Sequence, residues 1–282
     1  MLLQTLQNDF VSEISGIYDD REAENIFHLV VDHLTGINMK AGAGKDFTPD
    51  DLFYTKLEEI EHRLLNHEPI QYIINEAWFY DVPFYVDNRV LIPRPETEEL
   101  VHWVVKEQTG REYFTLLDIG TGSGCIPITL KRKLPAGTVY SCDISKCALD
   151  VAQKNARQYQ TDIRFLELDF LNSNTWEELP TFDIIVSNPP YIPESDSGTM
   201  HNNVLHHEPH LALFVANNNP LVFYEAIALM GKKLLNKKGA IYVEIHESLG
   251  NATVELFEKQ GYQTLLRKDM QNRDRMVKAI LQ

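Results

Sequence analysis

The chain has 282 residues, of which 44% are hydrophobic and 24% are charged. This composition is typical of a soluble globular protein and excludes a disordered or fibrous chain. Its length allows one large domain or two modest ones. No apolar stretch approaches the ~18 residues that a membrane-spanning helix needs, and the first residues lack the basic segment of a secretory signal. The three cysteines have no CxxC spacing, so neither a disulfide framework nor a zinc site is indicated. We expect a cytoplasmic protein.

The net charge of −15 is unevenly distributed. Residues 1–90 carry 6 Lys and Arg against 17 Asp and Glu, giving −11, whereas residues 91–282 carry 20 against 24, giving −4. A nucleic-acid binder normally has a basic stripe, because neutralising phosphates supplies most of its affinity. None is visible, so we expect no direct nucleic-acid partner. The acidic first third either attracts a basic protein or simply keeps the chain soluble.

Residues 1–75 are predicted to be helical, with residues 36–50 forming a glycine-rich loop that ends in a helix start at Thr48-Pro49. The aromatic and β-branched residues of 76–93 predict a β-hairpin. We therefore expect a helical domain over 1–75, a linking hairpin over 76–93 and a further domain over 94–282. The helices are indicated by apolar residues at helical spacing: Ala23, Ile26, Phe27, Val30, Val31 and Leu34, then Leu57, Ile60, Leu64 and Leu65.

From about residue 113 the pattern changes to alternating strands and helices. Nearly continuous apolar runs in the strands are typical of a parallel sheet that is covered on both faces. An α/β fold with a doubly wound sheet follows, in which ligands bind at the carboxyl ends of the strands. Strands are predicted at 114–119, 138–142, 163–168, 182–187 and 240–245, helices at 124–133, 146–158 and 221–235, and an antiparallel pair of strands in the tail.

The loop after the first of these strands is rich in glycine. It runs Gly120, Thr121, Gly122, Ser123, Gly124 and opens a helix. Glycine lets a backbone take positive φ and approach a ligand closely, and a helix start offers free N–H groups. The spacing GxGxG differs from the GxGxxG of dinucleotide enzymes, so a nicotinamide oxidoreductase is disfavoured.

Two further positions follow the next two strands. Asp143 can accept hydrogen bonds from both hydroxyls of a ribose, and Asp169 can accept from an adenine amino group on which Phe170 stacks. Taken singly, Asp143 also suits a helix cap and Phe170 a core position. Together with the glycine loop they predict an adenosine-containing ligand.

The run Asn188-Pro189-Pro190-Tyr191 directly follows strand 182–187. An amide or aromatic amine nitrogen is a poor nucleophile, and an enzyme helps by accepting hydrogen bonds from its N–H groups and aligning it with a methyl carbon. The Asn188 side-chain oxygen and the Pro189 carbonyl are the candidate acceptors, and Tyr191 offers a flat apolar wall. The run predicts an S-adenosylmethionine-dependent methyltransferase; the alternative is a simple turn.

The histidines between residues 201 and 210 do not have the spacing of a zinc-binding helix. They are interpreted as surface residues of a substrate-facing loop, and no metal site is predicted. They are His201, His206, His207 and His210.

These motifs together resemble those of the bacterial protein-(glutamine-N(5)) methyltransferases that modify peptide-chain release factors. The similarity covers nearly the whole chain and includes the Ile-Pro-Arg-Pro-Glu-Thr-Glu loop of residues 92–98, the segment 118–124, and the stretch Glu208-Pro209…Ala212-Leu213. It implies S-adenosylmethionine as donor and, as acceptor, the Gly-Gly-Gln glutamine of class 1 release factors. It also implies a helical domain before a Rossmann-like seven-stranded methyltransferase domain, with Arg94 and Glu96 among the substrate-binding residues.

Two segments depart from the family pattern. Residues 245–250 replace the usual glycine and glutamine after Glu244, and Asn272 occupies the glycine position of a late Asp-x-x-Gly-x-x-Arg pattern. Two other functions stay open. One is an exocyclic-amine methyltransferase acting on DNA or RNA, which uses a similar loop to hold a flipped base. The other is a non-catalytic adenosine-binding protein.

Overall fold

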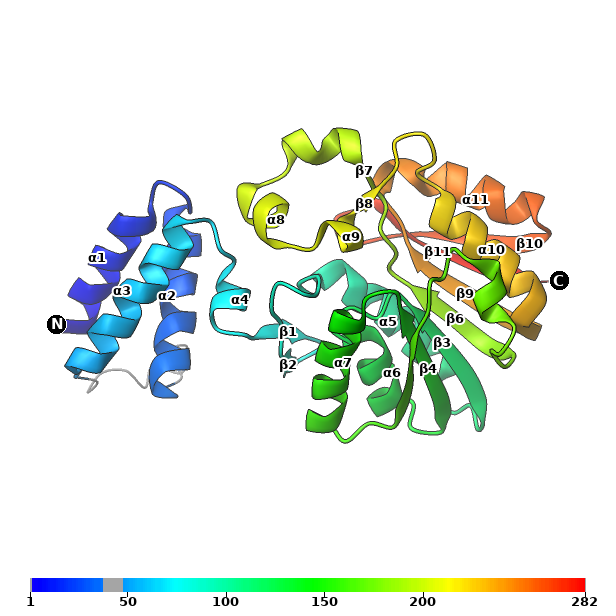
Figure 1. Cartoon of the computed structure of the whole chain (residues 1–282), viewed down its shortest axis with the longest axis horizontal. Coiled ribbons are helices and arrows are strands. Elements are labelled where there is room, and N and C mark those ends of the chain that lie inside the picture. The colour runs from blue at the N-terminus through cyan, green and yellow to red at the C-terminus, as the bar shows by residue number, and fades with distance from the viewer. Residues whose placement is uncertain (1, 38–47, 282) are drawn as a thin grey trace. The chain divides into compact units, whose positions relative to one another are not determined.

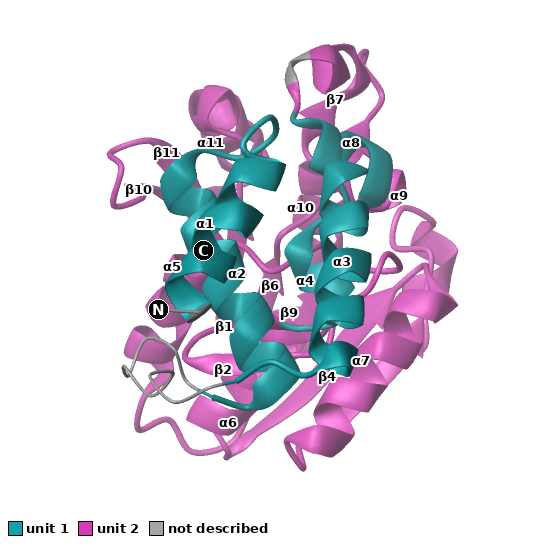
Figure 2. Cartoon of the chain, turned by 90° about the vertical axis from the view of Figure 1, so that its left-hand side faces the viewer, with its two compact units in different colours: residues 1–76, 201–207 teal, residues 77–200, 208–282 magenta. Residues whose placement is uncertain are grey.

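The computed structural model describes residues 2–37 and 48–281 (Figure 1). It contains two compact units, which Figure 2 colours separately. Unit 1 comprises Met1–Glu76 and His201–His207, and unit 2 comprises Ala77–Met200 and Glu208–Gln282. The structure thus assigns a short segment from the second half of the chain to the helical unit, whereas the predicted division at residues 75 and 93 is purely sequential and stays a prediction.

Unit 1 is helical, as predicted. Two of its helices begin at N-terminal caps: Asp19 accepts a hydrogen bond from the N–H of Glu22 at 2.8 Å, and Asp50 accepts one from the N–H of Phe53 at 2.8 Å. The apolar positions predicted from helical spacing lie in its core or pack against it, except Leu65, which is exposed. Residues 38–47 of the predicted loop lie outside the described residues. The helices are α1 (Leu2–Ile14), α2 (Asp20–Thr35), α3 (Asp51–Leu65), α4 (Ile70–Ile73) and α8 (Asn202–His207).

Unit 2 is built on a sheet which, within the described part of the chain, has seven strands in the order β10-β11-β9-β6-β3-β4-β5. The five strands from β9 to β5 run parallel, and β11 and β10 add an antiparallel edge. The predicted fold class and the antiparallel tail are confirmed. The strands are β3 (Phe114–Ile119), β4 (Gly137–Asp143), β5 (Ile163–Glu167), β6 (Phe182–Ser187), β9 (Leu235–Glu244), β10 (Tyr262–Lys268) and β11 (Asp274–Leu281).

Helices cover both faces of this sheet (Figure 1). Alternate residues of one strand enter opposite cores, because side chains of a strand point to its two faces in turn. Leu116 of β3 packs under α5, α6 and α7, whereas its neighbour Leu117 packs under α10 and α11. The helices are α5 (Pro95–Gln108), α6 (Cys125–Lys133), α7 (Lys146–Gln158), α10 (Val222–Leu234) and α11 (Gly250–Lys259). Burial on both faces explains why these strands show continuous apolar runs.

Smaller elements complete unit 2. The hairpin of β1 (Ala77–Phe79) and β2 (Val82–Phe84) lies within the segment predicted to form one. Short 3-10 helices lie at Ser173–Trp176, Glu194–Thr199 and Glu247–Leu249. β7 (Ile192–Pro193) pairs with β8 (Phe214–Val215), next to α9 (His210–Leu213). Among the described residues, no helix is long and apolar enough to cross a membrane.

The loop expected around the histidines is wrong in part. His206 and His207 lie in α8, and His210 begins α9. These helices have 6 and 4 residues, too few for a helical period to be visible in the sequence.

Candidate active site

A cleft opens at the carboxyl ends of β3, β4 and β6. The chain leaves β3 toward β4 on one side and later returns on the other side as β6, and ligands of open α/β sheets bind at such a reversal. The cleft encloses about 980 Å³ of space, part of it open to solvent. The predicted residues that line it are Gly120, Gly122, Asp143, Asp169, Phe170, Asn188, Pro189 and Pro190. The structure therefore brings the predicted donor and acceptor motifs to one site.

The glycine loop passes from β3 into α6 with a left-handed backbone at three positions. Gly120, Gly122 and Gly124 have φ of 80°, 52° and 82°. A Cβ on Gly124 would lie 2.9 Å from the Ile128 side chain and 3.1 Å from that of Ala152 in α7. Only glycine at this position therefore lets the start of α6 pack this closely against α7. The loop is thus shaped for close approach by both a ligand and a helix.

Thr121 and Ser123 lie on the inner side of the same loop. Thr121 is 4% exposed, and its hydroxyl contacts that of Ser141, which donates to Asp118 at 2.6 Å. Burial raises the pKa of Asp118 to about 7, and its Oδ1 atom has no hydrogen-bond partner among the described residues. Ser123 is 2% exposed, and its carbonyl accepts a bond from Asn155. Neither Thr121 nor Ser123 lines the cleft, so their predicted contact with the cofactor stays a prediction.

Asp143 ends β4 with its carboxylate on the cleft. One oxygen accepts from the N–H of Gly122 at 2.9 Å and the other from the N–H of Ser145 at 2.9 Å. Burial raises its pKa, and these backbone donors oppose that rise. Each carboxylate oxygen has two lone pairs, so both can still accept a hydrogen bond from a ligand hydroxyl. Ser145, rather than Asp143, caps α7.

Asp169 and Phe170 follow β5. Asp169 is exposed and accepts from the N–H of Leu171 at 3.1 Å. Phe170 is 6% exposed, its ring stacks on that of Trp176 with centroids 5.5 Å apart, and the residue also lines the cleft. Phe170 therefore belongs to the core and to the cleft wall at once.

The Asn188–Tyr191 run leaves β6 at the cleft. The carbonyl of Asn188 would lie 3.8 Å from a Cβ on Gly120, so the donor and acceptor loops nearly touch. Tyr191 is not among the residues that line the cleft. Its hydroxyl donates to Glu244 Oε1 at 3.2 Å, and its ring lies 6.0 Å from that of His246. Its predicted role as a wall over the acceptor stays a prediction.

Two buried residues behind Asn188 were not singled out from the sequence. Thr97, in the first turn of α5, accepts a hydrogen bond from Asn188 Nδ2 at 3.0 Å and donates one to Glu244 Oε2 at 2.6 Å. Glu244 ends β9 and is 1% exposed. The one sign of this pair in the sequence is the carboxylate near the end of the apolar strand 240–245, because a buried carboxylate needs a hydrogen-bond partner in the interior.

Burial and the neighbouring polar groups shift the pKa of Glu244. Burial raises its pKa to about 7, and Glu96 adds to the rise. The Thr97 hydroxyl, the Arg275 guanidinium and the Tyr191 hydroxyl act in the opposite direction. Glu244 therefore titrates near neutral pH, far above an exposed glutamate.

The two predicted substrate residues of the 92–98 loop differ in their surroundings. Arg94 forms an ion pair of 2.5 Å with Glu208, whose other oxygen accepts from the N–H of Ile92 at 3.3 Å. The Glu208 side chain is 1% exposed, so this pair ties the 92–98 loop to the 208–213 stretch. Glu96 is half-buried. Neither lines the cleft, and their contact with a substrate stays a prediction.

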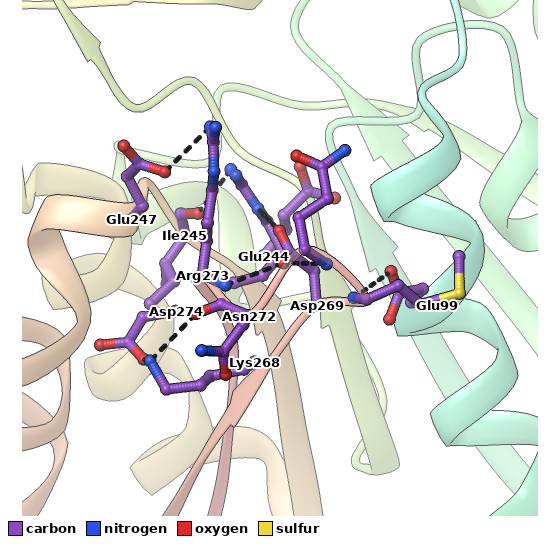
Figure 3. A network of polar contacts seen from close by, with 12 residues as sticks. Glu99, Glu244, Ile245, Glu247, Lys268, Asp269, Asn272, Arg273 and Asp274 are labelled. Atoms are coloured by element: carbon purple, nitrogen blue, oxygen red, sulfur yellow. Dashed lines mark hydrogen bonds and ion pairs between the residues drawn. The ribbon is translucent and has the colours of Figure 1, made fainter.

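Both departures from the family pattern are ordered: residues 245–250 include the 3-10 helix Glu247–Leu249, and Asn272 lies in the turn between β10 and β11. Asn272 has φ of 64°, a left-handed conformation that asparagine tolerates better than other residues with a side chain. Asp269 accepts from the N–H of Arg273 at 2.9 Å and pairs with Arg275 at 3.2 Å, while Glu247 pairs with Arg273 at 3.2 Å (Figure 3). Asp269 and Arg275 of the late motif thus pair although asparagine stands at its glycine position.

Within residues 2–37 and 48–281, no three His, Cys, Asp or Glu side chains are grouped closely enough to hold a metal ion.

Comparison with known proteins places this site in a family. Residues 97–213 match the model of the methyltransferase small domain. The release factor glutamine methyltransferase of Flavobacterium psychrophilum is 41% identical over 284 residues, covering 99% of each chain. That of Bacteroides thetaiotaomicron is 39% identical over 268 residues, covering 94% of this chain and 95% of its own.

A solved methyltransferase from Pyrococcus furiosus shares the fold, with a TM-score of 0.52 at 17% identity, covering 79% of this chain and 98% of its own. The identity to the curated relatives extends over nearly the whole chain, so it shows the family as well as the fold. The chain is a methyltransferase and belongs to the release factor glutamine methyltransferase family.

Proposed function

We infer that this protein transfers a methyl group from S-adenosylmethionine to the side-chain amide nitrogen of the glutamine in the Gly-Gly-Gln motif of class 1 release factors. The observation that carries this inference is the single cleft that joins Asp143 and the glycine loop to Asn188 and Pro189. The curated relatives named for release factor glutamine methylation, at about 40% identity along nearly the whole chain, support it.

The cleft residues fit S-adenosylmethionine. The Asp143 carboxylate keeps free lone pairs for the ribose hydroxyls, and Gly120 and Gly122 leave room for close approach of the ligand to the backbone. Ile144 and Leu168 add apolar surface for an adenine ring beside Phe170. When bound, S-adenosylmethionine supplies a methyl group activated by its positively charged sulfur.

The acceptor nitrogen is prepared by the chain itself. Its lone pair is delocalised into the amide carbonyl, so it reacts only when it is held in line with the methyl carbon. Asn188 Oδ1 and the Pro189 carbonyl are suited to accept its two N–H groups. The nitrogen–carbon bond forms as the carbon–sulfur bond breaks, and the methylated nitrogen then loses one proton, so no strong base is needed.

The competing function is methylation of an exocyclic amine of DNA or RNA. The negative charge of both parts of the chain opposes phosphate binding, and the curated relatives do not favour it. The test is incubation with methyl-labelled S-adenosylmethionine and either release factor or DNA. Label on the release factor, and none on a factor whose Gly-Gly-Gln glutamine is replaced by alanine, supports the proposal. Label on DNA refutes it.

A further inference from the structure

Asn188 is held by a chain of side chains that come from three separate elements. Asn188 follows β6, Thr97 lies in the first turn of α5, and Glu244 ends β9. The amide nitrogen of Asn188 lies 3.0 Å from the Thr97 hydroxyl, which lies 2.6 Å from Glu244 Oε2. Thr97 is 2% and Glu244 1% exposed, so water does not compete for the bond between them.

The direction of the hydrogen bonds follows from the chemistry of the groups. When Glu244 is ionised its carboxylate only accepts, so in that form the single hydroxyl proton of Thr97 points to Glu244. The hydroxyl lone pairs are then left for a donor, and the NH₂ group of the Asn188 amide supplies one. With its nitrogen turned to Thr97, the amide presents its oxygen on the opposite side.

We propose that Thr97 and Glu244 are positioning residues that fix the Asn188 amide with its oxygen toward the acceptor. This proposal rests on the proposed function, because only an acceptor that donates N–H groups needs an oxygen at this place. A flipped amide would present two donors and repel them.

The other contacts of Glu244 keep this arrangement rigid. Its Oε1 atom accepts from the Tyr191 hydroxyl at 3.2 Å, and its backbone carbonyl accepts from the Tyr224 hydroxyl at 3.0 Å. Glu244 therefore binds both Thr97 and the far end of the Asn188–Tyr191 run. Flipping the amide would take the Thr97 proton away from a buried carboxylate, which disfavours the flipped form about 10–100-fold.

Thr97→Val tests the proposal, because valine matches threonine in shape but has no hydroxyl. We expect kcat to fall about 10–100-fold while the KM for S-adenosylmethionine changes less than about threefold. Thr97→Ser, which keeps the hydroxyl, should restore most of the lost kcat. The matched control is Thr253→Val, because Thr253 is also fully buried and its hydroxyl has no partner among the described residues. That control should leave kcat unchanged.

A double-mutant cycle separates positioning from a general loss of structure. In an Asn188→Ala background no amide remains to be oriented, so adding Thr97→Val should lower kcat less than about twofold further. Equal losses in both backgrounds, or a Thr97→Val enzyme with wild-type kcat, would overturn the proposal. If Thr97→Val does not fold, Thr97→Ala takes its place in the same cycle.

Failure of the proposed function gives a different result. A folded wild-type enzyme that does not methylate release factor refutes that function. The cycle is then measured on DNA, where an exocyclic amine makes the same demand on Asn188 and the same non-additivity is expected.

Discussion

Asp143 is predicted to carry much of the affinity for S-adenosylmethionine. Its two oxygens each hold one backbone N–H, at 2.9 Å to Gly122 and 2.9 Å to Ser145, so the carboxylate is fixed before any ligand binds. A hydrogen bond to a charged group contributes roughly 1.5–3 kcal/mol. Asp143→Ala should therefore weaken binding about 10–100-fold.

The assay is isothermal titration calorimetry with S-adenosylmethionine. Asp143→Asn keeps one acceptor oxygen but turns an NH₂ group toward a backbone donor, so we expect it to lose about tenfold. Asp150→Ala, on the exposed side of α7, removes the same charge away from the cleft and serves as the control. An unchanged Kd in a folded Asp143→Ala protein would refute the assignment.

Four further predictions concern other parts of the molecule. Asn188→Ala should lower kcat about 10²–10³-fold with little change in cofactor Kd, and a loss below threefold would contradict its role. Because burial raises the pKa of Glu244 to about 7, its carboxylate is lost as the pH falls through that value, so kcat should decline from about pH 8 to about pH 6. Glu244→Gln should flatten that profile; an unchanged profile would exclude Glu244 as its source. Asn272→Gly should leave the unfolding free energy within about 1 kcal/mol or raise it, whereas Asn272→Ala should lower it by about 1 kcal/mol, as urea denaturation will show. Raising salt from roughly 50 to 300 mM should slow association with release factor severalfold, because residues 1–90 carry −11, but should barely affect a short Gly-Gly-Gln peptide. If release factor and the peptide show the same salt dependence, the negative charge of residues 1–90 serves only solubility.

The central sheet could be predicted from the sequence because strands that are buried on both faces consist mostly of apolar residues. Residues 114–119 and 182–187 are mostly apolar, and both runs form strands with these bounds. β9 was recognised only from residue 240, whereas it begins at Leu235. Its first part contains Asn236, Lys237 and Lys238, which look like a turn when read locally.

The site was predicted where a motif is continuous and missed where it depends on tertiary contact. The cleft residues Gly120, Gly122 and Asn188 stand in short runs that follow strands. Thr97 and Glu244 are 147 positions apart, and no spacing rule relates them. The place of His201–His207 in the helical unit was missed for the same reason, because these residues are far in sequence from the rest of that unit.

The most direct test of the proposed activity is to locate the transferred methyl group. Release factor treated with the enzyme and S-adenosylmethionine should be digested and mapped by mass spectrometry, with Asn188→Ala enzyme as the control. We predict one added methyl group on the side-chain amide of the Gly-Gly-Gln glutamine, strongly reduced with the control. A methyl group on another residue, or an unmodified glutamine after reaction with folded wild-type enzyme, would contradict the proposed function.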